Sequence, residues 1–114
     1  MPHIIIEHSS NIDNKNDVVK LLPIIHDLLV SEISANINAC KSRVYELDNY
    51  LVADNIKKSF IHITIKIMSG RSEEQKNNFG NILLKKLNDF FKDLPNLSNL
   101  SISLEIAELQ NYFK

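Results

Sequence analysis

The feature that most constrains the fold is a run of nine residues, 60–68, in which apolar and mixed positions alternate strictly. One side of this run consists only of isoleucine, at Ile61, Ile63, Ile65 and Ile67. Successive side chains of a strand point to opposite faces of a sheet, so the alternation predicts a strand with one face in the core. The other face is mixed in character, and we expect that it could meet a partner chain.

Other segments have strand or helix patterns of the same kind. Apolar, β-branched residues predict a first strand over 3–8, and alternation predicts further strands over 40–47 and 102–106. Apolar residues at helical spacing predict a helix over 17–34, with a local bend at Pro23 because proline removes a backbone donor. The alternative is a helix that starts later, at Pro23, since proline is favoured in a first turn.

A second helix has a sequence signal at each end. Ser72 and Gln75 form a capping box at its start, and Pro95 stops it. Gly80 falls in the middle, where glycine costs about 1 kcal/mol relative to alanine. We expect close packing to explain this glycine.

The predicted order is strand, helix, strand, a short excursion over 48–55, and then strand, helix, strand again. In each unit, the helix forms a right-handed crossover that connects two parallel strands. The sequence therefore predicts an α+β fold: one domain over 1–114, with two β-α-β units forming a four-stranded mixed sheet and both helices on one face. We expect the uncovered face to be rich in apolar residues and to be buried by oligomerisation.

Composition excludes several classes of function. The net charge of −1 gives no general attraction to nucleic acid or to membranes, and no apolar run approaches the length of a membrane span, about 20 residues. The N-terminus lacks the pattern of a signal peptide, so we expect a cytoplasmic protein. Cys40 is the single cysteine, predicted to be a small buried residue, and the four histidines have no metal-ligand spacing. We predict no metal and no cofactor.

Pro2 is the first candidate for chemistry. Removal of Met1 would leave a secondary amine at the start of a buried strand. Burial and nearby cations both lower the pKa of an amine toward neutrality, where it works well as a general base. The alternative is that Pro2 merely follows the start codon.

Arginine is scarce in this chain, with Arg43 and Arg71 against eleven lysines. Arg71 lies between a strand and the first turn of a helix, a position that suits a carboxylate ligand. The alternative for Arg71 is an ion pair with Glu73 or Glu74. Lys41 and Arg43 share one face of the second strand, and the alternative for both is a solvated strand edge.

Four segments together resemble the 5-carboxymethyl-2-hydroxymuconate isomerase family of the tautomerase superfamily. They occur in the family's order and at compatible spacing, and cover nearly the whole chain. The segments are Met1-Pro2-His3-Ile4-Ile5-Ile6-Glu7, Lys41-Ser42-Arg43, His62-Ile63-Thr64-Ile65-Lys66-Ile67 with Gly70-Arg71-Ser72, and Leu104-Glu105-Ile106-Ala107-Glu108-Leu109.

The resemblance implies a homotrimer and a cofactor-independent reaction that converts a 2-hydroxydienoate into its 2-oxo isomer. It implies Pro2 as the catalytic base, and Arg71, Arg43 and Lys41 as the groups that bind the carboxylates of a small acidic substrate. The family tends to carry arginine at the position of Lys41, and lysine keeps the charge but loses the bidentate fork.

Two other functions fit the same residues. One is another proline-dependent reaction on an unsaturated acid, of the hydratase or dehalogenase type, in which the proline acts in its protonated form. The other is a non-catalytic oligomeric binding protein with this fold. Retention of Met1 would favour the second, because the nitrogen of Pro2 would then be an amide.

Overall fold

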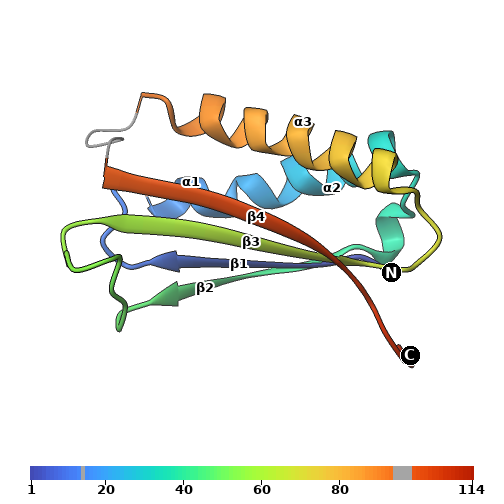
Figure 1. Ribbon diagram of the computed structural model, residues 1–114, viewed down its shortest axis with the longest axis horizontal. Coiled ribbons are helices and arrows are strands. Elements are labelled where there is room, and N and C mark those ends of the chain that lie inside the picture. Colours follow the sequence, from blue (N-terminus) through green and yellow to red (C-terminus); the bar gives the residue numbers. More distant parts are fainter. Residues whose placement is uncertain (14, 94–98) are drawn as a thin grey trace.

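The computed structural model describes residues 1–13, 15–93 and 99–114. Its elements in chain order are β1 (His3–Ser9), α1 (Lys15–Val19), α2 (Leu21–Ile33), the 3₁₀ helix η1 (Ile37–Ala39), β2 (Lys41–Leu47), β3 (Ser59–Ile67), α3 (Glu73–Phe91) and β4 (Leu100–Glu108). The strand order is β2-β1-β3-β4, and the helices cover one face of the sheet (Figure 1). β1–β2 and β3–β4 are parallel and β1–β3 is antiparallel, so the predicted α+β fold of two β-α-β units is confirmed.

The core lies between the sheet and the helices, and the central strands β1 and β3 supply its floor. Ile61, Ile63 and Ile65 are completely buried, as the alternation predicted. The β1 residues Ile4 and Ile6 lie opposite Ile65 and Ile63 and are also completely buried. Burial of each such side chain contributes about 1.5–3 kcal/mol, so this double row fixes the register of the sheet.

The first helical region differs from the prediction of one bent helix over 17–34. It consists of α1 and α2, which are separated at Lys20. Pro23 explains the break, because its ring would clash with the carbonyl group of Val19 and its nitrogen has no hydrogen to donate to it. The chain resolves this by starting α2 at Leu21, which places Pro23 in a first turn, where no donor is needed.

The start of α3 agrees with the prediction. The Ser72 hydroxyl accepts a hydrogen bond from the Gln75 N–H at 3.1 Å, and the Gln75 side chain accepts one from the Ser72 N–H at 3.0 Å. The helix ends at Phe91, whereas the predicted stop at Pro95 lies outside the described residues. Its buried stripe is Phe79, Leu83, Leu87 and Phe91.

The uncovered face of the sheet, here called the open face, is less apolar than predicted. Apart from apolar residues such as Ile5 and Phe60, its cross-strand neighbours are mainly polar or charged, as in the pairs His3–Lys66 and Glu7–His62. The prediction that this face is rich in apolar residues is therefore wrong. The mixed character predicted for the second face of β3 is confirmed.

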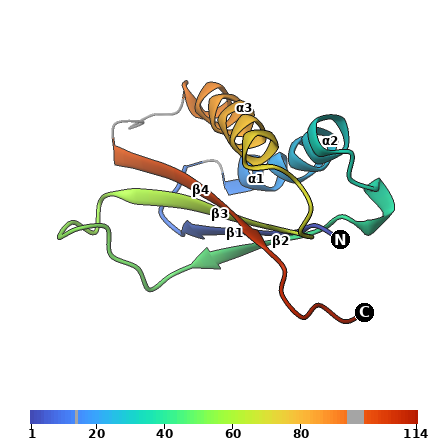
Figure 2. The same cartoon turned by 45° about the vertical axis from the view of Figure 1, so that its right-hand side comes forward.

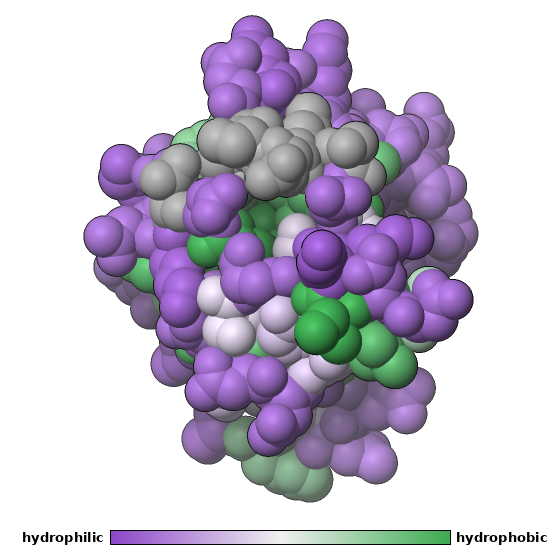
Figure 3. All heavy atoms as spheres, turned by 90° about the vertical axis from the view of Figure 1, so that its left-hand side faces the viewer, coloured by the Kyte–Doolittle hydropathy of each residue, from purple (hydrophilic) through white to green (hydrophobic). Residues whose placement is uncertain are grey.

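The two ends of the sheet differ in what they carry. The N-terminus and the turn into α3 lie at one end, and the C-terminal tail runs away from the helices near that end (Figures 1 and 2). The opposite end has a mainly hydrophilic surface with small apolar areas (Figure 3). Within the described residues, no helix combines the length and the apolarity needed to cross a membrane.

The two glycines give opposite stability predictions. A Cβ at Gly80 would meet the Ile106 and Leu104 side chains at 3.4 and 3.9 Å, which is ordinary contact, so the expectation that close packing requires this glycine is wrong. Gly70 has a φ of +118°, which side chains rarely adopt. Gly80→Ala should therefore raise the free energy of unfolding by up to about 1 kcal/mol, and Gly70→Ala should lower it. Urea denaturation of both variants measures this, and destabilisation by Gly80→Ala would contradict it.

Candidate active site

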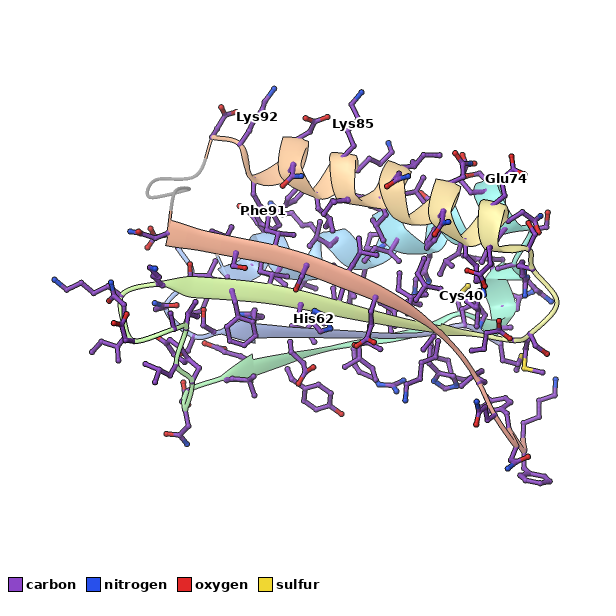
Figure 4. The ribbon with its side chains drawn as sticks, in the orientation of Figure 1. Cys40, His62, Glu74, Lys85, Phe91 and Lys92 are labelled. Atoms are coloured by element: carbon purple, nitrogen blue, oxygen red, sulfur yellow. The ribbon has the colours of Figure 1, made fainter. Side chains whose placement is uncertain are left out.

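The N-terminal end of β1 places Pro2 in the core layer. Pro2 is buried, and it precedes Ile4 and Ile6 on the face that the helices cover. Its carbonyl oxygen accepts a hydrogen bond of 3.1 Å from the N–H of Lys41, which ties the start of the chain to the start of β2. Cys40 packs against the core at the same end (Figure 4). The fold thus holds the first residues by both backbone and side-chain contacts.

The amine at the chain terminus, carried by Met1, has a pKa below its usual value. Partial burial is the main cause, and Arg71, Lys114 and Lys41 lower it further by charge repulsion. The Cys40 sulfur would raise this pKa only as a thiolate. Burial also raises the pKa of the Cys40 thiol, so this sulfur is a neutral neighbour at ordinary pH. The site therefore favours an uncharged amine.

Arg71 lies in the turn before α3 and is near enough to the terminal amine to lower its pKa. Its Nη2 donates a hydrogen bond of 3.0 Å to the carbonyl oxygen of Ile33, the last residue of α2. A cation at this negative helix end is favourable, and the contact holds the guanidinium in place. Glu73 pairs with Lys76 instead, so among the described residues the ion pair considered as an alternative for Arg71 does not form. No second hydrogen bond of this guanidinium forms within the described residues, so its other donors can serve a ligand.

The two other predicted cations lie on the opposite face from Pro2. Lys41 and Arg43 are next to His3 and Ile5 in the parallel pairing of β1 and β2, and these residues belong to the open face. Lys41 is near enough to lower the pKa of the terminal amine. The Nη1 of Arg43 donates a hydrogen bond of 2.9 Å to the Nδ1 of His3. The structure thus places Arg71 and Lys41 near enough to act on the terminal amine, whereas Arg43 bonds His3 on the open face.

Three residues near this site had no functional role in the sequence prediction. The Nε2 of His3 lies 2.9 Å from the Tyr112 hydroxyl, and Lys114 is among the charges that act on the terminal amine. His3 has a local signal, because it adjoins Pro2 and pairs with Lys41 in the register. Tyr112 and Lys114 lie more than a hundred residues away along the chain, so only the folded structure brings them here.

The arrangement suits proton transfer on an anionic substrate. It combines an amine of lowered pKa with fixed positive charges, which provide a base and a binding site for carboxylates. Within the residues that the structure describes, no three His, Cys, Asp or Glu side chains are grouped to hold a metal ion.

Comparisons with known proteins agree with this geometry. The family model described as 5-carboxymethyl-2-hydroxymuconate isomerase matches residues 2–114. The 5-carboxymethyl-2-hydroxymuconate Delta-isomerase of Escherichia coli is 32% identical over 110 residues, which cover 96% of this chain and 87% of that protein.

Solved structures share the fold. A 5-carboxymethyl-2-hydroxymuconate isomerase from Deinococcus radiodurans R1 is similar with a TM-score of 0.86 and 26% identity, covering 99% of this chain and 87% of that one. A wild-type fused 4-OT solved as a symmetric trimer is similar with a TM-score of 0.69 and 13% identity, covering 98% and 94% of the two chains. At 13% identity, the similarity to the fused 4-OT structure shows a shared fold and nothing more.

Substitution can test whether Arg71 lowers the pKa of the terminal amine. Arg71→Leu removes the largest positive charge effect on the amine, so the pKa of the amine should rise. Arg71→Lys keeps the charge and should leave this pKa nearly unchanged. The rate of amine acylation as a function of pH reports the pKa in each variant. A pKa that stays constant in Arg71→Leu would contradict the assignment.

Proposed function

The chain belongs to the 5-carboxymethyl-2-hydroxymuconate isomerase family, and we propose that it converts a 2-hydroxydienoate of this kind into its 2-oxo isomer with Pro2 as the base. Membership makes it a tautomerase-type isomerase. The single observation that supports Pro2 is the surroundings of the chain terminus, where burial and three cations favour an uncharged amine. The proposal requires removal of Met1, after which the amine belongs to Pro2.

A terminal Pro2 would be a better base in this site than Met1. Its nitrogen lies one residue deeper, on a residue that is buried, so desolvation acts on it more strongly. The neutral amine takes the proton from the 2-hydroxyl group of the dienol. It then delivers the proton to a distal carbon, as the electron pair moves through the conjugated system to form the 2-oxo group. No cofactor takes part in this sequence.

The neighbouring cations would bind the substrate carboxylates and stabilise charge on the 2-oxygen. Arg71 is the first candidate because its guanidinium is fixed by α2 and has further donors that no described residue uses. Lys41 contributes a point charge at the edge of the site. Arg43 contributes from the open face, where one of its nitrogens already bonds His3.

We also propose that the chain forms a homotrimer. Both β2 and β4 are edge strands of the sheet, and free strand edges readily pair with another chain. A groove of about 310 Å³ runs beside β4, where Leu104 and Ile106 meet Gly80 and Leu84 of α3. The trimer of the fused 4-OT relative shows that this fold supports such an assembly.

The catalytic proposal is tested on protein whose mass shows that Met1 has been removed. Pro2→Ala should slow conversion of 2-hydroxymuconate, followed by ultraviolet absorbance, by roughly 100-fold, the usual scale of general-base catalysis. Pro23→Ala changes an exposed proline of α2 and should leave the rate unchanged. Turnover by Pro2→Ala at the wild-type rate would refute the role of Pro2.

The pH dependence of the same reaction separates a base from an acid. A base acts in its neutral form, so kcat/KM should rise as the pH passes through the pKa of the amine. Because burial and cations lower this pKa, the rise should occur below the usual range of a terminal amine. Activity that falls with pH over this range would favour the protonated proline of a hydratase or dehalogenase.

The trimer predicts a mass in solution of three times the 13.1 kDa chain. Light scattering coupled to size-exclusion chromatography measures it directly. Leu104→Glu places a charge in the groove beside β4 and should shift the mass toward one chain, because an unpaired buried charge is costly. Ser101→Glu adds the same charge at an exposed position of β4 and serves as the control. A wild-type mass of one chain would contradict the proposal.

A further inference from the structure

The end of the open face nearest Pro2 carries a row of positive charge. His3 lies between Lys41 of β2 and Lys66 of β3 in the cross-strand register, and Arg43 is one row further along. Within residues 1–13, 15–93 and 99–114, the ion pairs include none of these lysines or the arginine. A group of cations without carboxylate partners attracts an anion.

The hydrogen bonds at this place have a defined direction. Arginine has donors only, so the bond of 2.9 Å between Arg43 and His3 makes the Nδ1 of His3 an acceptor. A neutral imidazole carries one hydrogen, which must then be on Nε2. The Nε2–H therefore donates to the Tyr112 oxygen, 2.9 Å away. The chain of bonds runs from Arg43 through His3 to Tyr112.

In this chain of hydrogen bonds, Tyr112 acts only as an acceptor, and its hydroxyl hydrogen is not used. The tyrosine oxygen accepts from His3, so its own O–H is free to donate to a further acceptor. Each bond of such a chain polarises the next, which makes the terminal O–H a stronger donor. Edge-on packing of the His3 and Tyr112 rings, with centroids 5.5 Å apart, holds the C-terminal tail in this position.

We propose that Tyr112 binds a carboxylate of the substrate through its hydroxyl group, and that His3 is a positioning residue which directs this hydroxyl. An anionic oxygen accepts the free O–H and is attracted by Lys41 and Lys66, whereas a cation would be repelled. Partial burial and, after it, positive neighbours also keep the pKa of His3 low, consistent with the neutral ring. The inference rests on the proposed function, since it takes the ligand to be the acid substrate of that site.

Binding of adipate tests the proposal independently of catalysis. Adipate is a dicarboxylate without a dienol, so its binding needs no proton transfer and is unaffected if the protein proves inactive on 2-hydroxymuconate. Titration calorimetry on the full chain gives the affinity. Tyr112→Phe removes one oxygen and should weaken adipate binding roughly tenfold, as expected for a hydrogen bond to a charged group.

The matched control is Tyr45→Phe. Tyr45 lies on the same face of the sheet, is 53% exposed, and loses the same atom in this substitution. It should change adipate affinity by less than about twofold, the range of an ordinary surface substitution. Equal affinity in Tyr112→Phe and wild type, or no adipate binding to wild type at millimolar concentration, would overturn the proposal.

Substitution of His3 tests whether this residue acts through Tyr112. His3→Leu should weaken adipate binding in the wild-type background but have little further effect when combined with Tyr112→Phe. His3→Gln retains an acceptor for Arg43 and a donor for Tyr112, so it should restore much of the affinity. Melting temperatures show that each variant is folded. An equal loss from His3→Leu in both backgrounds would refute the positioning role.

Discussion

The packing of β1 against β3 is the contact on which the rest of the structure depends. The buried isoleucines of both strands form one layer beneath the helices, and their register fixes which way every neighbouring side chain points. Because successive residues of a strand alternate between faces, Pro2 belongs to the core layer and His3 to the open face. A shift of one residue would exchange the two, and the amine would lose its apolar surroundings.

Pro2 and the next residue, His3, therefore lie in two different chemical environments, on opposite faces of the same end of the sheet. On the core side, burial and Arg71 act on the terminal amine. On the open side, Arg43, His3 and Tyr112 form a directed chain of hydrogen bonds, and the lysines beside it have no ion-pair partner among the described residues. Both environments favour anionic oxygen and disfavour additional protons. The same charges can thus lower the pKa of the base and bind the acid on which it acts.

The sequence predicted the architecture and a candidate amine at Pro2. It did not predict which charged residues lie around that amine. Alternation and helical spacing are local signals, so the bounds of the four strands were predicted to within two residues and the capping box at the residues where it occurs, Ser72 and Gln75. The break at Lys20 was missed because Pro23 was treated as a bend inside one helix. Lys41 and Arg43 were grouped with Pro2 by resemblance, whereas the parallel register places their side chains on the other face.

By itself the sequence determined the strand faces, the β-α-β order and a proline able to become a terminal amine, because these follow from spacing along the chain. The tertiary structure alone decided which charges surround that amine. Arg71, in the crossover from β3 to α3, acts on it through its charge, and Tyr112 reaches His3 across 109 positions of sequence. Electrostatic effects depend on distance in space, and sequence separation carries no measure of that distance until the strands are paired.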